Sequence, residues 1–288
     1  MKILITGAGG QLGAELQRQL AEGGSSLGPL PERLKNATVI STDVAELDIT
    51  DRAAAIAFVR RHQPDTIISC AAFKVNAMGA SHLAQAAERV GARLIHVSTD
   101  YVFSGEGDAP LDESCPIRPV SAYGRTKALG EEYVRNFCHR FFIVRTAWLY
   151  GYNGSNFVKT MVNAGKKFGR LEVVNDQLGN PTNAEDLAHH ILKLAVSHDY
   201  GVYHCTGEGV CSWYDFAKEI IRLAGVDAQV APCTSAEYAA KHPAAASRPA
   251  WSALENRMLA CTVGNGMRPW QEALQCYFDH WDGENGLK

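Results

Sequence analysis

Short apolar runs alternate with longer amphipathic segments through the first half of the chain. Residues 2–6 predict a buried strand, and the leucines at positions 12, 16 and 20 that follow it recur at helical spacing. The alternation continues with strands predicted at residues 38–42, 66–69, 93–97 and 142–145, and helices at 51–62 and 81–90. This rhythm is typical of an α/β fold built on a doubly wound, Rossmann-like parallel sheet.

The pattern loosens after residue 150 into loops that contain glycine, asparagine and proline. Helices are predicted there near residues 156–164, 184–195 and 213–224. We therefore expect a first domain over residues 1–150 and a smaller C-terminal domain over residues 151–288. The first would carry the sheet and a dinucleotide, and the second would mainly bind and cover a substrate.

A glycine-rich turn joins the first predicted strand to the first helix. Gly7 and Gly10 let the backbone turn tightly and approach a pyrophosphate, and Gly13 lets the helix pack close to the strand. The amides at the start of the helix, at Gln11 and Leu12, would then face the phosphates. Strand, turn and helix in this order predict a dinucleotide site rather than a plain loop.

The second predicted strand ends at Asp43, whose carboxylate is placed to accept hydrogen bonds from an adenosine ribose. That role favours NADH, although Asp43 could equally cap a turn, and no basic residue stands beside it to hold a 2′-phosphate. The preference between NADH and NADPH therefore stays open. Asp48 and Ile49, just before a helix capped by Thr50 or Asp51, are placed to flank the adenine.

Tyr123 and Lys127 lie four residues apart in a predicted helix, hence one turn apart on the same face. A neighbouring ammonium favours the phenolate, so we expect a lowered pKa for Tyr123, in the range of a general acid or base. Ser98 and Thr99 end the apolar run 94–97, where parallel sheets place their ligands, and one of these hydroxyls would share a substrate carbonyl oxygen with the phenol. A Tyr-x-x-x-Lys pair alone is common on solvated helices. The strand end and the glycine turn make hydride transfer from a nicotinamide the favoured function.

Composition narrows the classes of function. The 288 residues carry a net charge of −3 with both signs mixed along the chain, so no basic tract favours nucleic acid or an anionic membrane. No apolar run approaches the roughly 20 residues of a membrane span, and the chain opens on a strand rather than a signal peptide. Eight cysteines without a Cys-x-x-Cys pair support neither a disulfide framework nor a metal cluster. We expect a soluble, cytoplasmic protein with reduced thiols.

Six motifs spread over most of the chain resemble the dTDP-4-dehydrorhamnose reductase family of extended short-chain dehydrogenases. They are Gly-Gly-Gln-Leu-Gly13, Ser-Thr-Asp-Tyr-Val-Phe103, Tyr-Gly-Arg-Thr-Lys127, Arg-Thr-Ala-Trp148, Asn-Asp-Gln-Leu-Gly-Asn-Pro-Thr182 and Ser-Arg-Pro-Ala-Trp-Ser252. The resemblance implies reduction of the 4-keto group of dTDP-6-deoxy-L-lyxo-4-hexulose with NADPH or NADH. The product would be dTDP-L-rhamnose, a precursor of bacterial cell-surface polysaccharide.

The resemblance also implies a role for each matching residue. It makes Thr99, Tyr123 and Lys127 the catalytic set, in which Tyr123 protonates the developing alkoxide and Lys127 binds the nicotinamide ribose. The other implied contacts are Cys70, Ala71 and Ala72 to the cofactor, Asp100, Tyr101, Trp148 and Asn156 to the sugar nucleotide, and Arg248 to the substrate diphosphate. The alternatives to these substrate contacts are that Trp148 is an ordinary core residue and that Arg248 forms a surface ion pair.

Two other functions stay open on the same scaffold. The first is a sugar-nucleotide dehydratase or epimerase, but a 4,6-dehydratase needs Thr-Asp-Glu, because elimination requires a second acid, and Tyr101 takes the third place here. The second is a non-catalytic regulatory subunit that binds the dinucleotide as a scaffold, as the regulatory chain of methionine adenosyltransferase does. The intact Tyr123 and Lys127 argue against it.

The chain departs from the family pattern after Ala72. The family has a further stretch before the segment that resembles residues 73–77, and this sequence lacks it. Either the stretch is deleted or the sequence misses a piece of the protein. The second explanation is favoured because residues 74–83 keep the family's helix pattern, and an intact mass of 31.3 kDa would exclude it.

A second departure concerns a metal. Some family members form a dimer through Mg²⁺ and acidic residues, and Glu15 and Glu185 occupy two such positions while His280 takes the third. Because Mg²⁺ prefers oxygen ligands, the histidine argues against a metal-bridged dimer. Glu15 is expected on the exposed side of its helix, and both a monomer and a homodimer stay open.

Overall fold

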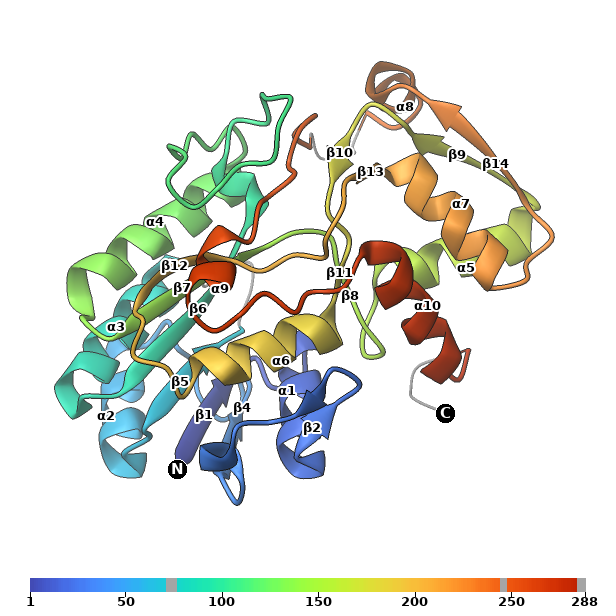
Figure 1. The fold of residues 1–288 in the computed structure, drawn as a ribbon. Helices are drawn as coiled ribbons and strands as arrows, with labels where there is room; N and C mark the ends of the chain where they lie inside the picture. Colours follow the sequence, from blue (N-terminus) through green and yellow to red (C-terminus); the bar gives the residue numbers. More distant parts are fainter. Residues whose placement is uncertain (71–76, 244–247, 284–288) are drawn as a thin grey trace.

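Six parallel strands form the main sheet, in the order β12-β7-β6-β5-β1-β4 (Figure 1). They are β1 (Lys2–Thr6), β4 (Thr38–Thr42), β5 (Thr66–Ser69), β6 (Arg93–Thr99), β7 (Phe141–Thr146) and β12 (Gly201–His204). The computed structural model describes residues 1–70, 77–243 and 248–283, so Ala71 and Ala72 lie outside the described residues. The parallel order, with β4 and β5 on opposite sides of β1, confirms the predicted doubly wound sheet.

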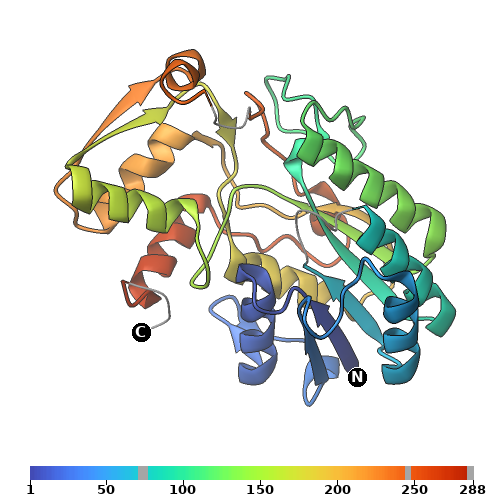
Figure 2. The ribbon, with the colours of Figure 1, turned by 180° about the vertical axis from the view of Figure 1, so that it is seen from behind.

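Helices cover both faces of this sheet (Figures 1 and 2). One face packs against α2 (Arg52–His62), α3 (Met78–Val90) and α4 (Ala122–Phe137), and the other against α1 (Gln11–Glu22) and α6 (Ala184–Leu194). Successive residues of a strand point to opposite faces, so Leu4 joins the first core while Ile3 and Ile5 join the second. Because both faces are buried, the strands are continuous apolar runs in the sequence.

The predicted elements of the sheet are confirmed, with shifts of one residue at some ends, such as those of β7, and three larger differences. β6 continues to Thr99, α3 begins at Met78, and β12 was not predicted. β12 pairs with β7 in the main sheet, and α6 packs on α1 in the helix layer that covers one face of it. Part of the region predicted as a second domain therefore belongs to the sheet and its helix layer. The four residues of β12 are too few to show a pattern of their own. A substrate-covering role for residues 151–288 stays a prediction.

A second lobe lies beside the sheet, at the right of Figure 1. It consists of α5 (Phe157–Phe168), β9 (Arg170–Val174), α7 (Trp213–Leu223), β14 (Gln229–Cys233), α8 (Ser235–Lys241) and α10 (Trp270–His280). Its own apolar core includes Phe216, Ile220 and Tyr277. The remaining short elements are β2 (Gly24–Ser25), β3 (Gly28–Pro29), β8 (Leu149–Tyr150), β10 (Leu178–Gly179), β11 (Thr182–Asn183), β13 (Cys211–Ser212), α9 (Arg257–Cys261) and two 3₁₀ turns at Glu32–Leu34 and Asp100–Val102.

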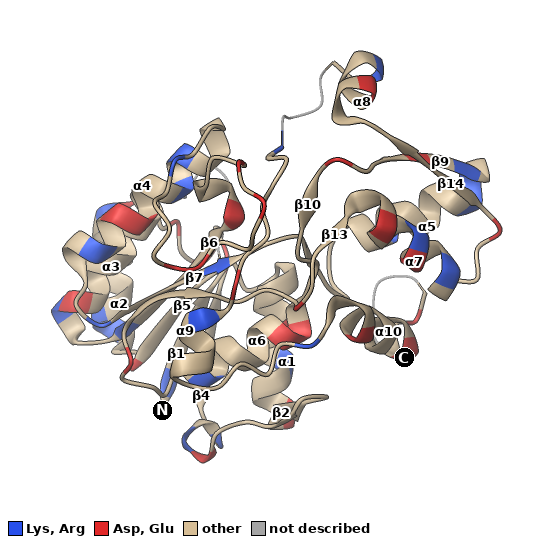
Figure 3. Ribbon diagram, turned by 45° about the horizontal axis from the view of Figure 1, so that its top comes forward, with Lys and Arg blue, Asp and Glu red and all other residues tan. Residues whose placement is uncertain are grey.

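Charged residues of both signs are interspersed over the outer helices of both lobes (Figure 3). The eight cysteines, at residues 70, 115, 138, 205, 211, 233, 261 and 276, are all free. Among the helices that the structure describes, none combines the length and apolar character needed to cross a membrane.

Candidate active site

The carboxyl ends of the parallel strands bring the predicted site residues to one edge of the sheet. β1 ends before Gly7, β4 before Asp43, β5 before Cys70, and β6 ends at Thr99. Since β1 lies between β4 and β5, the connections from the first strands diverge at this point. Open α/β sheets bind their ligands at such a switch point.

The glycine turn needs a left-handed backbone at Gly7 and leaves no room for a side chain at Gly13. Gly7 has a φ of 71°, a left-handed conformation that glycine adopts without strain. A Cβ atom on Gly13 would lie 2.3 Å from the Gly7 carbonyl oxygen, so this glycine allows α1 to approach β1. No side chain caps α1 at Gly10, and its first turn contains no acidic residue. The amides of Gln11 and Leu12 are therefore placed to bind an anion.

A cleft of about 340 Å³ borders this turn. Its lining includes six of the predicted cofactor residues, namely Gly7, Gly10, Asp43, Asp48, Ile49 and Cys70. Asp43 Oδ2 accepts a hydrogen bond from the Gly9 amide at 2.8 Å, so this carboxylate holds the turn while it faces the cleft. Asp48 accepts hydrogen bonds from the amide and hydroxyl of Thr50, which lower its pKa. The geometry fits both the turn-capping and the ribose-binding interpretation of Asp43.

The start of α4 places Tyr123 beside the end of β6. Ser121 caps the helix by accepting a hydrogen bond from the Gly124 amide at 3.0 Å. A Cβ atom on Gly124 would lie 2.1 Å from the Tyr101 carbonyl oxygen, so the helix packs directly on the 3₁₀ turn that follows β6. A hydrogen bond joins the side chains of Tyr123 and Thr99. Two of the three predicted catalytic residues are therefore in contact.

Lys127 does not act on Tyr123 as the sequence predicts, and the expected lowering of the phenol's pKa is wrong. Burial raises the pKa of Tyr123, the Asp100 carboxylate raises it further, and the hydrogen bond with Thr99 acts in the opposite direction. The Lys127 ammonium instead donates to the Val97 carbonyl oxygen at 2.5 Å. Its own pKa is lowered to about 8 by burial. A phenol with a raised pKa is protonated at neutral pH, which is the state that a proton donor requires.

Asp100 and Tyr101 lie beside the hydroxyl groups of Thr99 and Tyr123. Burial raises the pKa of Asp100 to about 6, although hydrogen bonds with Thr99 and Ser252 act against the shift. The Tyr101 ring meets the Tyr123 ring edge to face, with 5.7 Å between the centroids. Burial and the Asp100 charge raise the pKa of Tyr101 to about 12. A carboxyl group and two phenols thus converge beside Thr99.

Two tryptophans extend this region toward the second lobe. Trp148 has a φ of 47°, an uncommon conformation for a bulky side chain, and its ring stacks on Trp213 with 3.5 Å between the centroids. The Arg248 guanidinium lies 5.0 Å from the centroid of the Trp213 ring. A cleft of about 440 Å³ is lined by Trp213, Arg248, Phe157 and Met161 among others. Aromatic faces and a guanidinium suit a nucleobase and a diphosphate.

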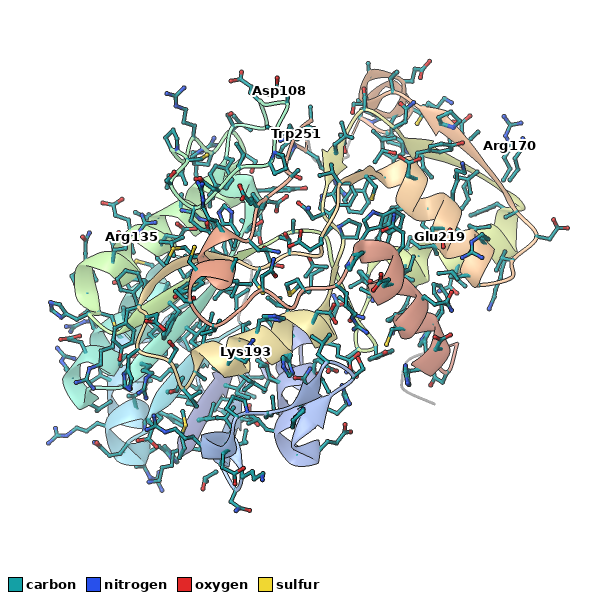
Figure 4. The ribbon with its side chains drawn as sticks, viewed as in Figure 1. Asp108, Arg135, Arg170, Lys193, Glu219 and Trp251 are labelled. Atoms are coloured by element: carbon teal, nitrogen blue, oxygen red, sulfur yellow. The ribbon has the colours of Figure 1, made fainter. Side chains whose placement is uncertain are left out.

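The segment that carries Arg248 is tied to the loop after β6. The Trp251 indole, labelled near Asp108 in Figure 4, donates from Nε1 to the Ala109 carbonyl oxygen at 2.9 Å. The Trp251 amide donates to the Gly105 carbonyl oxygen at the same distance. These contacts place the following Ser252 beside Asp100.

Asn156 connects the second lobe to the glycine turn. Its Oδ1 accepts from the Lys159 amide at 3.1 Å and so caps α5. Its Nδ2 donates to the Gly151 carbonyl oxygen at 2.8 Å and to Gln11 Oε1 at 3.2 Å. In this arrangement the amide group serves the protein's own contacts, and its contact with a sugar nucleotide stays a prediction.

Glu15 is buried, which corrects the expectation of an exposed side. Glu15 is 2% exposed and Glu185 5% exposed, because α6 covers this side of α1. Arg18 lies between them, with its guanidinium 2.5 Å from Glu15 and 3.2 Å from Glu185. A cation of the chain itself thus compensates the two carboxylates that the resemblance offers to Mg²⁺. Within residues 1–70, 77–243 and 248–283, no group of three or more His, Cys, Asp or Glu side chains is placed to hold a metal ion.

A comparison with known proteins identifies the family. A family model described as the RmlD substrate binding domain matches residues 1–282. The chain belongs to the RmlD family. This result confirms the resemblance drawn from the six sequence motifs.

Relatives and solved structures agree with the RmlD assignment along nearly the whole chain. The spore coat polysaccharide biosynthesis protein SpsK of Bacillus subtilis (strain 168) is 39% identical over 290 residues, which cover 96% of each chain. The structure of a dTDP-4-dehydrorhamnose reductase from Clostridium acetobutylicum ATCC 824 is 47% identical, has a TM-score of 0.89, and covers 97% of this chain and 99% of that one. The dTDP-4-dehydrorhamnose reductase of Bacillus anthracis str. Ames in complex with NADP is 37% identical, with a TM-score of 0.87 and coverage of 96% and 98%.

Sequence reasoning missed two residues that the structure brings to this candidate site. Trp213 gives no local signal, because its contact with Trp148 joins segments remote in sequence. Glu131 follows Lys127 by one helical turn, and that spacing was the available signal for its position behind the site.

Proposed function

We propose that this chain reduces the 4-keto group of dTDP-6-deoxy-L-lyxo-4-hexulose to dTDP-L-rhamnose with NADPH or NADH. The observation that carries the proposal is the placement of Thr99, Tyr123 and Lys127 around the end of β6, at the sheet edge that also holds the glycine turn. The names of the related reductases support a dTDP-linked sugar as the substrate.

The glycine turn and the cleft beside it would hold the dinucleotide. The close approach at Gly13 and the uncapped start of α1 fit a diphosphate, and Asp43, Asp48 and Ile49 line the cleft on the adenosine side. When bound, the dinucleotide supplies the hydride that C4 of the sugar receives. Cys70 lines the same cleft.

Tyr123 donates its phenolic proton to the substrate oxygen as the carbonyl becomes an alkoxide. The ketone gains a hydride at its carbon and a proton at its oxygen, and the product is the alcohol. The raised pKa keeps the proton on Tyr123 until that negative charge develops. Thr99 donates a hydrogen bond to the same oxygen, and the buried Lys127 ammonium binds the nicotinamide ribose.

The other end of the substrate lies toward the second lobe. Asp100, Tyr101 and Trp148 contact the sugar, and Arg248 binds the diphosphate as a guanidinium fork beside the Trp213 ring. Asn156 is assigned to the sugar nucleotide through the family resemblance. The free thiols support a cytoplasmic location for this reaction.

The test is NADPH consumption by the purified chain with the ketosugar nucleotide, compared with Tyr123→Phe. We expect the variant to lose about 10²- to 10⁴-fold in kcat, the usual contribution of a general acid, and to keep its affinity for NADPH. Tyr133→Phe, on the same helix, is the matched control. Activity retained in Tyr123→Phe would remove Tyr123 as the proton donor, and tight NADPH binding without turnover by the wild type would favour the regulatory-subunit alternative.

A further inference from the structure

A carboxylate is buried behind the candidate catalytic residues. Glu131 lies one turn after Lys127 on α4 and is 0% exposed. Its Oε1 accepts hydrogen bonds from the Ser98 hydroxyl at 2.6 Å and from Arg145 Nε at 2.9 Å, and its Oε2 accepts from a second Arg145 nitrogen at 2.8 Å. Arg135, labelled on α4 in Figure 4, adds a longer contact of 3.3 Å. One carboxylate thus joins α4, β6 and β7.

These contacts lie next to the groups that would perform the reaction. Ser98 directly precedes Thr99, and it stands opposite Arg145 in the pairing of β6 with β7. The bond from Ser98 to Glu131 therefore holds the end of β6 against α4. Because Thr99 is on β6 and Tyr123 is on α4, this bond connects the two elements that carry the reacting hydroxyl groups.

The charges around Lys127 provide a second, independent connection. Lys127 is 3% exposed, and its ammonium interacts with Cys70 just after β5, His96 on β6 and Glu131 on its own helix. Burial keeps the first two neutral, because it raises the pKa of Cys70 to about 12 and lowers that of His96 well below its usual range. Glu131 is the charged carboxylate that acts on Lys127, and it raises the pKa of the ammonium against the effect of burial.

We infer that Glu131 is a positioning residue of this site, which holds the Ser98–Thr99 end of β6 against α4 and supplies the buried negative charge opposite the Lys127 ammonium. The inference rests on the proposed function, since that function gives Lys127 its role as a cation. The buried ion pair between Glu131 and Arg145 is by itself weak evidence for a functional role, because replacing such a pair with apolar side chains is often neutral for stability. Here Glu131, from the helix that carries Tyr123 and Lys127, also accepts a hydrogen bond from Ser98 on the strand that carries Thr99.

Glu131→Gln tests the charge, because it keeps an oxygen for Ser98 and removes the carboxylate. In the wild type we expect kcat to fall on the alkaline side as Lys127, with a pKa of about 8, loses its proton. Loss of the opposite charge lowers the pKa of Lys127. The alkaline limb of the kcat–pH profile should therefore move to lower pH by about one unit in the variant, which is a roughly tenfold loss of kcat in alkaline buffer. Glu132→Gln, the exposed neighbour on the same helix, is the matched control and should leave the limb in place.

A second variant separates positioning from folding. Glu131→Gln leaves Arg145 without its carboxylate, whereas the double variant E131Q/R145M replaces the pair by neutral side chains of similar volume. We expect the double variant to have a Tm near that of the wild type and an alkaline limb that is still displaced. A double variant with both a wild-type Tm and a wild-type limb would overturn the inference, because Glu131 would then serve the fold alone. Glu131→Asp, which keeps the charge, should keep the limb near its wild-type position.

The affinity for NADPH provides a readout that does not depend on turnover. The Kd for NADPH, measured by fluorescence over the same pH range, should weaken at a lower pH in Glu131→Gln than in the wild type. An unchanged Kd profile in the variant would contradict the inference even in a chain that reduces the ketosugar. A wild-type chain that binds NADPH with this pH dependence but does not reduce the sugar would contradict the proposed function and leave the inference supported.

Discussion

The Thr99 hydroxyl donates a hydrogen bond to the Asp100 carboxylate, with 2.9 Å between Oγ1 and Oδ1. The same Thr99 oxygen accepts a hydrogen bond from the Tyr101 amide at 3.3 Å. To donate to a substrate carbonyl, this hydroxyl has to rotate away from Asp100. A buried carboxylate is then left to accept a hydrogen bond from the sugar, so substrate binding and the activation of Thr99 are coupled at Asp100.

Asp100→Asn is expected to stabilise the protein in a pH-dependent way. The carboxyl has a pKa of about 6 in the folded chain, against about 3.9 in the unfolded chain. The folded state therefore binds the proton more tightly, and the stability of the wild type rises as the pH falls from about 6 to about 4. The variant removes this dependence and should be more stable by up to about 3 kcal/mol at neutral pH, with a smaller difference near pH 4. Urea denaturation at several pH values measures the difference, and a constant value would contradict the raised pKa. Its kcat/KM should fall.

Asp43→Asn is expected to shift the cofactor preference toward NADPH. The amide oxygen of asparagine can still accept from the Gly9 amide, so the glycine turn keeps the hydrogen bond that the structure shows. The variant loses the negative charge that would repel a 2′-phosphate. We expect the ratio of kcat/KM for NADPH to that for NADH to rise about tenfold, as removal of one unfavourable charge interaction predicts. Steady-state kinetics with both cofactors measure this ratio, and a ratio equal to that of the wild type would exclude Asp43 from the ribose site.

Gly13→Ala is expected to destabilise the fold and prevent dinucleotide binding. Its Cβ atom would lie 2.3 Å from the Gly7 oxygen and 2.7 Å from Ala8 Cα, and these backbone atoms cannot move without separating α1 from β1. We expect a loss of about 3 kcal/mol in the free energy of unfolding, at the upper end for overpacking. Gly10→Ala is the control, because its Cβ would lie 3.3 Å from the same oxygen. Equal stabilities of the two variants would contradict the steric explanation.

Arg18→Ala is expected to leave Glu15 buried without its cation and Glu185 with only the Arg268 guanidinium, 3.7 Å away. Glu15 and Glu185 are almost fully buried, so we expect a loss of about 3 kcal/mol, as for other broken buried pairs. Glu22→Ala removes the exposed partner of Arg18 and should change stability by less than about 1 kcal/mol. Thermal unfolding of the three proteins gives these values. Chelation by EDTA should leave the Tm of the wild type unchanged, and a marked fall would show that a metal, rather than Arg18, compensates these carboxylates.

The local sequence pattern was sufficient to predict most of the main sheet and the helices that cover it. The strand before Gly7 and the helix after Asp51 lie where they were predicted, because apolar periodicity and capping residues act within a few positions along the chain. It was insufficient for β12, whose place in the sheet depends on its pairing with β7. It was also insufficient for Trp213, which contacts Trp148 across a long separation in sequence.

By itself, the sequence determined the parallel sheet and the residue types at its carboxyl edge, from the glycine turn to the Tyr123–Lys127 spacing, because these features depend on neighbours within one or two turns. Only the tertiary structure decided the electrostatic state of those residues. Burial raised the pKa of Tyr123 against expectation, and the packing of α6 on α1 buried Glu15 against Arg18. Desolvation and long-range pairing depend on which surfaces come together in the fold, and no local pattern of residues specifies that.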